Sequence, residues 1–217
     1  MTDTQTAAQR PPRRLMLGLL AALWTLLVIM VITYFSWQKA RSESAILTDD
    51  GTLPVLMEAP EFALTNRDGS TVANDDLLGQ PWVADFIFTR CPGICPVLSE
   101  RMQELADQTP ADGVRWVSIS VDPEHDTPEV LQAYAEKLEA KDNWLFLTGA
   151  TSEVTSIIKE GFKLVLDPTP MLEGDGVIVH SNRFVLVDAD GKIRGYYNAF
   201  EADELAALRE DLASLMS

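Results

Sequence analysis

The amino-acid sequence predicts an α/β domain whose core is a parallel sheet with helices on both faces, preceded by one apolar N-terminal segment. Strand-like and helical segments alternate through the middle of the chain, which is typical of a parallel sheet. Asp-Gly turns at 68–69 and 190–191 mark a hairpin on each side of that alternating region. The 217 residues suffice for one domain with an appendage, but not comfortably for two.

Residues 15–35 form an apolar run of 21 residues without a charge. A transmembrane helix needs about 20 such residues, so we expect this run to be an uncleaved membrane anchor. A cleaved signal peptide is the competing interpretation. It has an apolar region of only about 7–15 residues, followed by a small-x-small site that residues 36–39 do not supply.

Basic residues predict the orientation of this anchor. Three arginines lie within the first 14 residues, whereas Lys39 and Arg41 follow the run and are offset by Glu43. This excess favours a cytoplasmic N-terminus. The N-terminus does not resemble a mitochondrial transit peptide, so we expect a single pass through a bacterial inner membrane with the C-terminal domain in the periplasm. The predicted organisation is a cytoplasmic tail at 1–14, an anchor at 15–35, a tether at 36–54 and a folded domain at 55–217.

The elements of the domain follow in chain order from hydrophobic period and turn signals. The strands are expected at 62–65 and 70–72 (a hairpin), 82–88, 115–121, 144–148, and 183–187 and 192–197 (a second, antiparallel hairpin at the edge of the sheet). The helices are expected at 97–107, 128 to about 140, 153–160 and 201–216. Asp126 or Thr127 should cap the second helix, because Pro128 suits the first position of that helix. Gly161 should end the third helix.

The net charge argues against one class of partner. Beyond residue 14, the remaining 14 basic and 32 acidic residues carry a formal charge of −18. Such a surface repels phosphates and attracts cations, so we expect no nucleic-acid partner.

Cys91 and Cys95 are the two cysteines of the sequence, placed between a predicted buried strand and a helix. A helix N-terminus favours the thiolate, which is both the nucleophile and the metal ligand. A disulfide over so short a loop would contribute only about 2 kcal/mol. Inert buried thiols do not fit a Pro/Gly loop, and structural zinc needs four ligands. The i, i+4 offset places both sulfurs on one side of a helical turn, where they can hold a soft ion such as Cu(I), but redox chemistry stays open.

Three segments together resemble the Sco/SenC family: FTRCPGICP at 88–96, SVDPEHDTPEVLQAYAEKL at 120–138 and VIVHSNRFVLVDADGKIRGYY at 177–197. The resemblance extends from about Ala59 to the C-terminus. It implies a thioredoxin-like fold, membrane tethering and copper delivery to cytochrome c oxidase. It also implies Cys91, Cys95 and His180 as ligands of Cu(I) or Cu(II), and the copper-site subunit of the oxidase as partner. Reduced cysteines in an oxidising compartment imply an external thiol reductant.

The two histidines are interpreted differently. On residue type alone, His180 would be a hydrogen-bonded histidine of the interior; the resemblance makes it a copper ligand. His125 lies in a loop entering a helix, and we expect it to be solvated. Many family members carry Asp where this chain has Gly93, so copper affinity or thiol reduction potential should differ here.

Asp85 supplies the argument for the redox alternative. It lies six residues before Cys91 in an apolar strand, the offset at which thioredoxins carry a buried aspartate that accepts a proton. Burial would raise its pKa and suit it to thiol–disulfide exchange; a polar edge or a pairing Lys or Arg is the other interpretation.

The main prediction is a copper-binding assembly factor without turnover. The alternative is a thiol–disulfide oxidoreductase acting on cysteines of the oxidase copper site or serving a redox sensor. A peroxide-reducing enzyme using Thr89-Arg90 ranks last.

Overall fold

The computed structural model describes residues 22–36, 52–110, 112–164, 167–170 and 177–216. The chain divides into two compact units, Met1–Thr52 and Leu53–Ser217, and each is described by itself.

In the first unit, residues 22–36 form a helix whose side chains are almost all exposed. Among the residues that the structure describes, no helix has the length and apolar character that a membrane crossing requires. Residues 15–21 of the expected anchor, the 1–14 tail and residues 37–51 of the tether lie outside the described residues.

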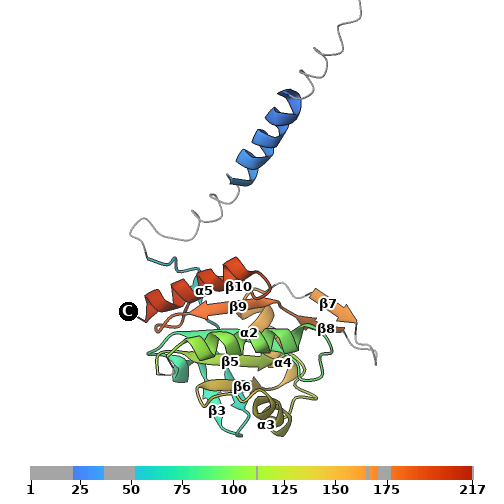
Figure 1. Cartoon of the computed structure of the whole chain (residues 1–217). Coiled ribbons are helices and arrows are strands. Elements are labelled where there is room, and N and C mark those ends of the chain that lie inside the picture. The colour runs from blue at the N-terminus through green and yellow to red at the C-terminus, as the bar shows by residue number, and fades with distance from the viewer. Residues whose placement is uncertain (1–21, 37–51, 111, 165–166, 171–176, 217) are drawn as a thin grey trace, which may run out of the picture. The chain divides into compact units, whose positions relative to one another are not determined.

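The second unit is built on an eight-stranded sheet with strand order β1-β10-β9-β4-β5-β6-β2-β3 (Figure 1). Its strands are β1 (Met57–Glu58), β2 (Ala63–Asn66), β3 (Thr71–Ala73), β4 (Trp82–Ile87), β5 (Arg115–Ser120), β6 (Trp144–Thr148), β9 (Arg183–Val187) and β10 (Lys192–Asn198). Strands β4, β5 and β6 pair in parallel, which confirms the predicted parallel core. The hairpin β2–β3 extends this core beyond β6.

The late hairpin has a different place from the one expected. Strand β9 pairs antiparallel with β4, and β10 pairs with β9, but β1 then pairs with β10 and forms the edge. The hairpin is therefore internal to the sheet, because β1 pairs with its outer strand. Strand β1 has only two residues, which is too short for a hydrophobic period to show in the sequence.

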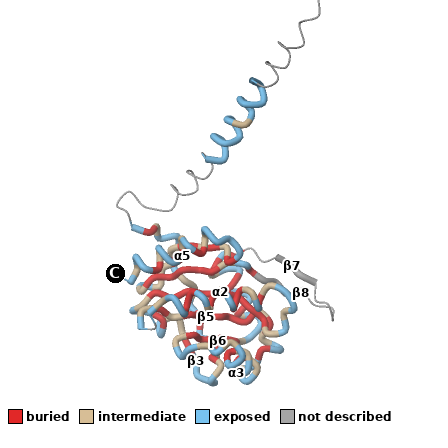
Figure 2. The backbone as a smooth tube through the Cα atoms, in the orientation of Figure 1, coloured by how far each residue is buried: buried red, intermediate tan, exposed pale blue. Residues whose placement is uncertain are grey.

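Helices cover both faces of the sheet, as predicted, and the buried residues gather between these layers (Figure 2). The helices are η1 (Asn74–Leu77), α2 (Ile94–Gln108), α3 (Pro128–Lys137), α4 (Thr151–Ser156), the π-helix η2 (Ile157–Gly161) and α5 (Ala202–Leu215). Leu98 of α2, Leu131 of α3 and Leu208 of α5 share one core. Val154 of α4 and Ile157 of η2 belong to the core on the other face.

Helix boundaries and one hairpin differ from expectation, and the helix expected at 153–160 is α4 followed by the π-helix η2. Helix α2 begins at Ile94, three residues early, because its N-cap Gly93 offers no capping side chain that would mark a start. Helix α3 ends at Lys137 rather than near residue 140. Strands β7 (Asp167–Pro170) and β8 (Val177–His180) form a separate hairpin that was not predicted, since two prolines in four residues argue against a strand.

Candidate functional site

The two cysteines lie where strand β4 passes into helix α2. All six residues of β4 are buried, and the strand ends beside the carboxyl end of the parallel strand β5. The Cys91 amide donates a hydrogen bond to the Phe88 carbonyl oxygen at 3.2 Å, which closes a tight turn before the helix. Because α2 begins at Ile94, Cys95 lies in its first turn, whereas the sequence prediction placed both cysteines before the helix.

The two thiols differ in exposure. Cys95 is fully buried in the core beneath α2, whereas Cys91 is partly exposed. Burial raises the pKa of the Cys95 thiol; a hydrogen bond with the Phe88 backbone lowers it, and the contact with the Cys91 thiol raises it again. The expectation of a thiolate favoured by the helix N-terminus is therefore wrong for Cys95, because lost hydration outweighs the helix dipole. Cys91 is the thiol that a partner or an ion can reach first.

Asp85 lies beneath this pair, on the face of the sheet that α2 covers. Its side chain is fully buried, and burial raises its pKa to about 7, while the hydroxyl of Ser118, its neighbour on β5, lowers it. Within the described part of the chain, neither carboxylate oxygen has a hydrogen bond of ordinary geometry, so the Ser118 contact is weak. The polar-edge interpretation is wrong, since burial is complete. The charge of Asp85 raises the pKa of Cys95, so the fold brings these two groups together.

A tyrosine that sequence reasoning did not single out completes the buried polar cluster. The Tyr134 hydroxyl on α3 and the Ser99 hydroxyl on α2 lie 2.9 Å apart. Burial raises the pKa of Tyr134 to about 12; the Ser99 hydrogen bond lowers it, and the charges of Asp85 and Cys95 raise it further. Tyr134 lies in the segment 120–138 quoted above, but a helical tyrosine carries no signal of what it faces.

The loop before Cys91 is tied to the loop between β5 and α3. Thr89 donates to the Asp126 carboxylate from its amide at 3.1 Å and from its hydroxyl at 2.5 Å. Arg90 pairs with Asp122 at 2.6 Å. The Ser120 hydroxyl donates to Asp126 at 2.6 Å. Both carboxylates belong to the segment SVDPEHDTPE, in which the sequence analysis assigned a helix cap but no contact with the cysteine loop.

The backbone of His180 ends β8 and is paired with Asp167 of β7. Strand β9 follows and runs antiparallel to β4, with Val185 opposite Ala84. The beginning of β9 therefore lies beside the carboxyl end of β4, and the cysteine loop follows that end of β4. The side chain of His180 lies outside what the structure describes.

His125 is exposed, as expected, and its amide donates to the Asp122 carbonyl oxygen at 3.0 Å. Among the side chains that the structure describes, no group of three His, Cys, Asp or Glu is arranged to hold a metal ion.

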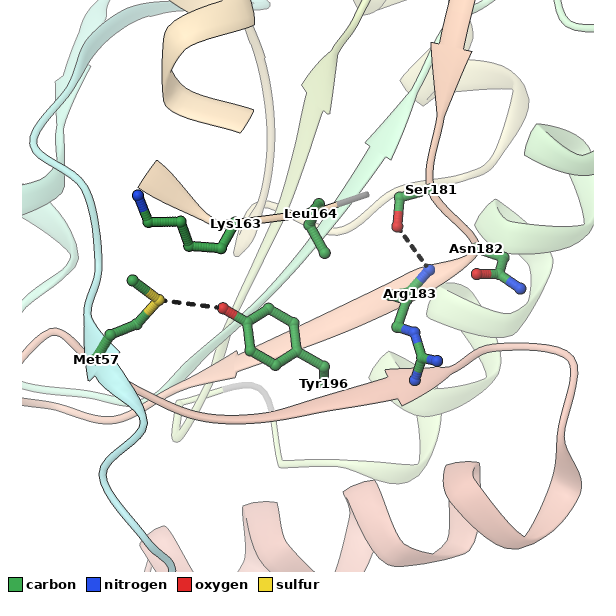
Figure 3. A pocket seen from close by; sticks show the side chains of 7 residues that line it. All are labelled: Met57, Lys163, Leu164, Ser181, Asn182, Arg183 and Tyr196. Atoms are coloured by element: carbon green, nitrogen blue, oxygen red, sulfur yellow. Dashed lines mark hydrogen bonds between the residues drawn. The ribbon is translucent and has the colours of Figure 1, made fainter. Parts of the chain in front are cut away.

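A separate pocket of about 440 Å³ opens on the other face of the sheet, beside Met57 and Tyr196, which pack on the core of that face (Figure 3). The Tyr196 hydroxyl donates to the Phe162 carbonyl oxygen at 2.9 Å and points toward the Met57 sulfur. The residues lining the pocket are Met57, Lys163, Leu164, Ser181, Asn182, Arg183 and Tyr196. Neither thiol nor Asp85 contributes to it.

Known proteins resemble more than two thirds of this chain. An SCO1 protein homolog of Bacillus subtilis (strain 168) is 38% identical over 152 residues, covering 68% of this chain and 77% of its own. The solved structure of BsSco, described as a member of the Sco family of cytochrome c oxidase assembly proteins with a disulfide switch, is 37% identical. It covers 76% of this chain and 96% of its own, with a TM-score of 0.66. Bradyrhizobium japonicum ScoI with copper bound is 28% identical, covering 73% and 99%, with a TM-score of 0.57.

The fold and the paired thiols define a thioredoxin-like α/β protein with a dithiol at a helix N-terminus. The SCO1/SenC family model matches residues 54–217, and the chain belongs to this family.

Proposed function

We propose that this protein is a membrane-anchored metallochaperone that binds copper through Cys91, Cys95 and His180 and assists assembly of the copper site of cytochrome c oxidase. The observation that carries the proposal is the thiol pair: two adjacent sulfurs at the start of α2, one of them partly exposed. Two soft thiolates and an imidazole suit copper. Relatives described as a copper-binding protein and as Sco proteins with copper bound support the same cargo.

The proposed route of copper follows from the exposure of the two thiols. Cys91 is accessible, so a ligand of the recipient copper-site subunit can replace it first, while buried Cys95 holds the ion until transfer is complete. The cycle needs both cysteines reduced, so an external thiol reductant acts between rounds. In this proposal residues 15–35 anchor the protein in a bacterial inner membrane, residues 1–14 are cytoplasmic, and the 55–217 domain, joined by the 36–54 tether, lies in the periplasm.

Copper titration of the reduced full-length protein tests the proposal. We expect one tightly bound copper per chain, a thiolate-to-Cu(II) absorption band, and at least about a tenfold loss of affinity in His180→Ala, because a direct ligand is worth more than an outer-shell partner. His125→Ala is the matched control, since that histidine is exposed in a loop. Absent binding, or equal binding by the two variants, would contradict a Cys₂His copper site.

Thiol–disulfide exchange is a second candidate, favoured by buried Asp85 beside Cys95. The Cys91 thiolate would attack a partner disulfide and release one partner thiolate; Cys95, losing its proton to Asp85, would then displace the second. Cys91 and Cys95 end as a disulfide, and the partner leaves as a dithiol after taking up two protons. Slow reduction of a test disulfide by Asp85→Asn, with copper binding absent in the parent protein, would support this function instead.

The peroxide-reducing alternative gains nothing from the geometry. The Thr89 hydroxyl is bonded to Asp126, and Arg90 is paired with Asp122. Both side chains therefore bind carboxylates of the β5–α3 loop, and neither contact favours peroxide reduction at Cys91.

A further inference from the structure

Asp126 is a carboxylate whose side chain is fully buried and whose hydrogen-bond donors come from two other segments of the chain. It accepts from the Thr89 amide, the Thr89 hydroxyl and the Ser120 hydroxyl, at 3.1, 2.5 and 2.6 Å. Two of these three bonds hold one residue, which lies two positions before Cys91 and 37 positions before Asp126 in the sequence. The buried carboxylate is therefore a link between two loops.

Helix capping does not account for Asp126. Thr127 caps α3, because its side chain accepts a hydrogen bond from the Val130 amide. Asp126 is the residue before that cap, and its carboxylate points to the cysteine loop instead. The β5–α3 loop supplies a second link through Asp122, which is paired with Arg90, and the Ser120 hydroxyl accepts from the Asp122 amide at 3.1 Å.

The cost of this arrangement suggests that it serves the site. Removing a carboxylate ion from water costs several kcal/mol, and an apolar contact between the loops would stabilise the fold at lower cost. Here two buried carboxylates, Asp126 and Asp122, bind Thr89 and Arg90, the two residues directly before Cys91. Since the Cys91 amide is bonded back to Phe88 at 3.2 Å, fixing Thr89 and Arg90 leaves the backbone of this turn little freedom.

We infer that Asp126, through Thr89, is a positioning residue that holds the cysteine loop in the conformation in which Cys91 and Cys95 face one ion or form one disulfide. The inference rests on the proposed role of the two thiols. Outer-shell partners of metal ligands typically change metal affinity by about 10- to 100-fold when they are removed.

The test uses Asp126→Asn, Thr89→Val and Thr89→Ser in the full-length protein. Asn places an amide N–H₂ among groups that are all donors, and Val removes the Thr89 hydroxyl at nearly constant volume, whereas Ser keeps it. Thr109→Val is the matched control, because the Thr109 hydroxyl donates to the Leu105 carbonyl oxygen at the end of α2, away from the cysteine loop. The readouts are Cu(I) affinity against a competing chelator, the dithiol–disulfide equilibrium of Cys91 and Cys95 in glutathione buffer, and the unfolding midpoint.

We expect Asp126→Asn and Thr89→Val to lose copper affinity about 10- to 100-fold and to shift the glutathione equilibrium, while Thr89→Ser and Thr109→Val stay at the parent values. If Thr89→Val matches Thr109→Val in copper affinity and in the equilibrium, the positioning role is refuted, whatever the unfolding midpoints. If the parent protein binds no copper, the proposed copper function is lost, but the metal-free glutathione equilibrium still decides this inference. Should Asp126→Asn fail to fold, the Thr89 variants decide it.

Discussion

At the scale of single residues, Asp85 shows a buried carboxyl group that pairs with no cation among the side chains the structure describes. Its pKa lies near 7 in the folded protein and near 3.8 when the chain is unfolded, with burial as the main cause. Between these two values the folded state binds more protons than the unfolded state, so the free energy of unfolding falls as pH rises from about 4 to about 7 and then levels. A difference of this size corresponds to about 4 kcal/mol.

We therefore expect Asp85→Asn to remove this pH dependence. The unfolding free energy of the parent protein minus that of the variant should fall by about 4 kcal/mol between pH 4 and pH 8, because Asn does not titrate. Urea unfolding of the reduced, metal-free proteins at several pH values measures this difference. Asp107→Asn is the control, because that carboxylate is exposed and pairs with Lys141 at the surface. Parallel curves for Asp85→Asn and the parent protein would refute a buried, neutral Asp85.

At the scale of elements, the residue at the N-cap of α2 affects the charge around the two thiols. The N-cap of this helix is Gly93, and a Cβ atom placed there would meet no atom within 4 Å. Its φ of −121° lies in a range that any residue adopts. Crowding therefore does not require the glycine, and an aspartate side chain would find room at this position.

Gly93→Asp should consequently fold without a clash and change the chemistry of the thiols. A carboxylate two positions from Cys91 adds a negative charge to the cysteine loop and opposes a second one, so the alkylation rate of Cys91 at pH 7 should fall several-fold. Gly93→Asn, which has the same size without the charge, controls for capping and bulk. Mass spectrometry after timed iodoacetamide treatment measures both rates. Equal rates for the Asp and Asn variants would show that charge at this position does not reach the thiol.

At the scale of the whole molecule, the sheet brings distant segments to one edge. Parallel strands β4 and β5 end side by side, so the loops that follow them meet, and antiparallel β9 starts at the same edge. This arrangement places the cysteine loop, the Asp122–Asp126 segment and the chain after His180 together although they are separated by 30 to 90 positions in the sequence. The net acidic charge of the chain favours a cation over an anion as its ligand.

The proposed anchor also concerns the whole chain. If residues 15–35 remain attached, the full-length mass should be found in the membrane fraction, resist carbonate extraction and be released by detergent. A cleaved signal peptide would instead leave a shorter soluble chain, which intact-mass measurement of both fractions distinguishes. Deletion of residues 1–36 should move the folded domain to the soluble fraction. A full-length chain that carbonate releases would contradict the anchor.

Much of the fold was predictable because its signals are local. The parallel core, both Asp-Gly hairpins and the Thr127 cap follow from hydrophobic period, turn residues and capping chemistry, which act within a few residues. The start of α2 was missed since Gly93 provides no capping side chain. The β7–β8 hairpin was missed because prolines in β7 oppose the strand assignment.

The sequence by itself determined the reactive residues: Cys91 and Cys95 four positions apart after a buried strand, with Asp85 six positions earlier. Only the tertiary structure decided how these groups behave. Burial of Cys95 reverses the effect expected from the helix N-terminus, Asp85 lies beneath Cys95, and Asp126 binds Thr89 instead of capping the beginning of α3. The physical reason is that solvation and hydrogen bonding at these atoms depend on segments tens of residues away, whose meeting point is set by strand order and not by any local pattern.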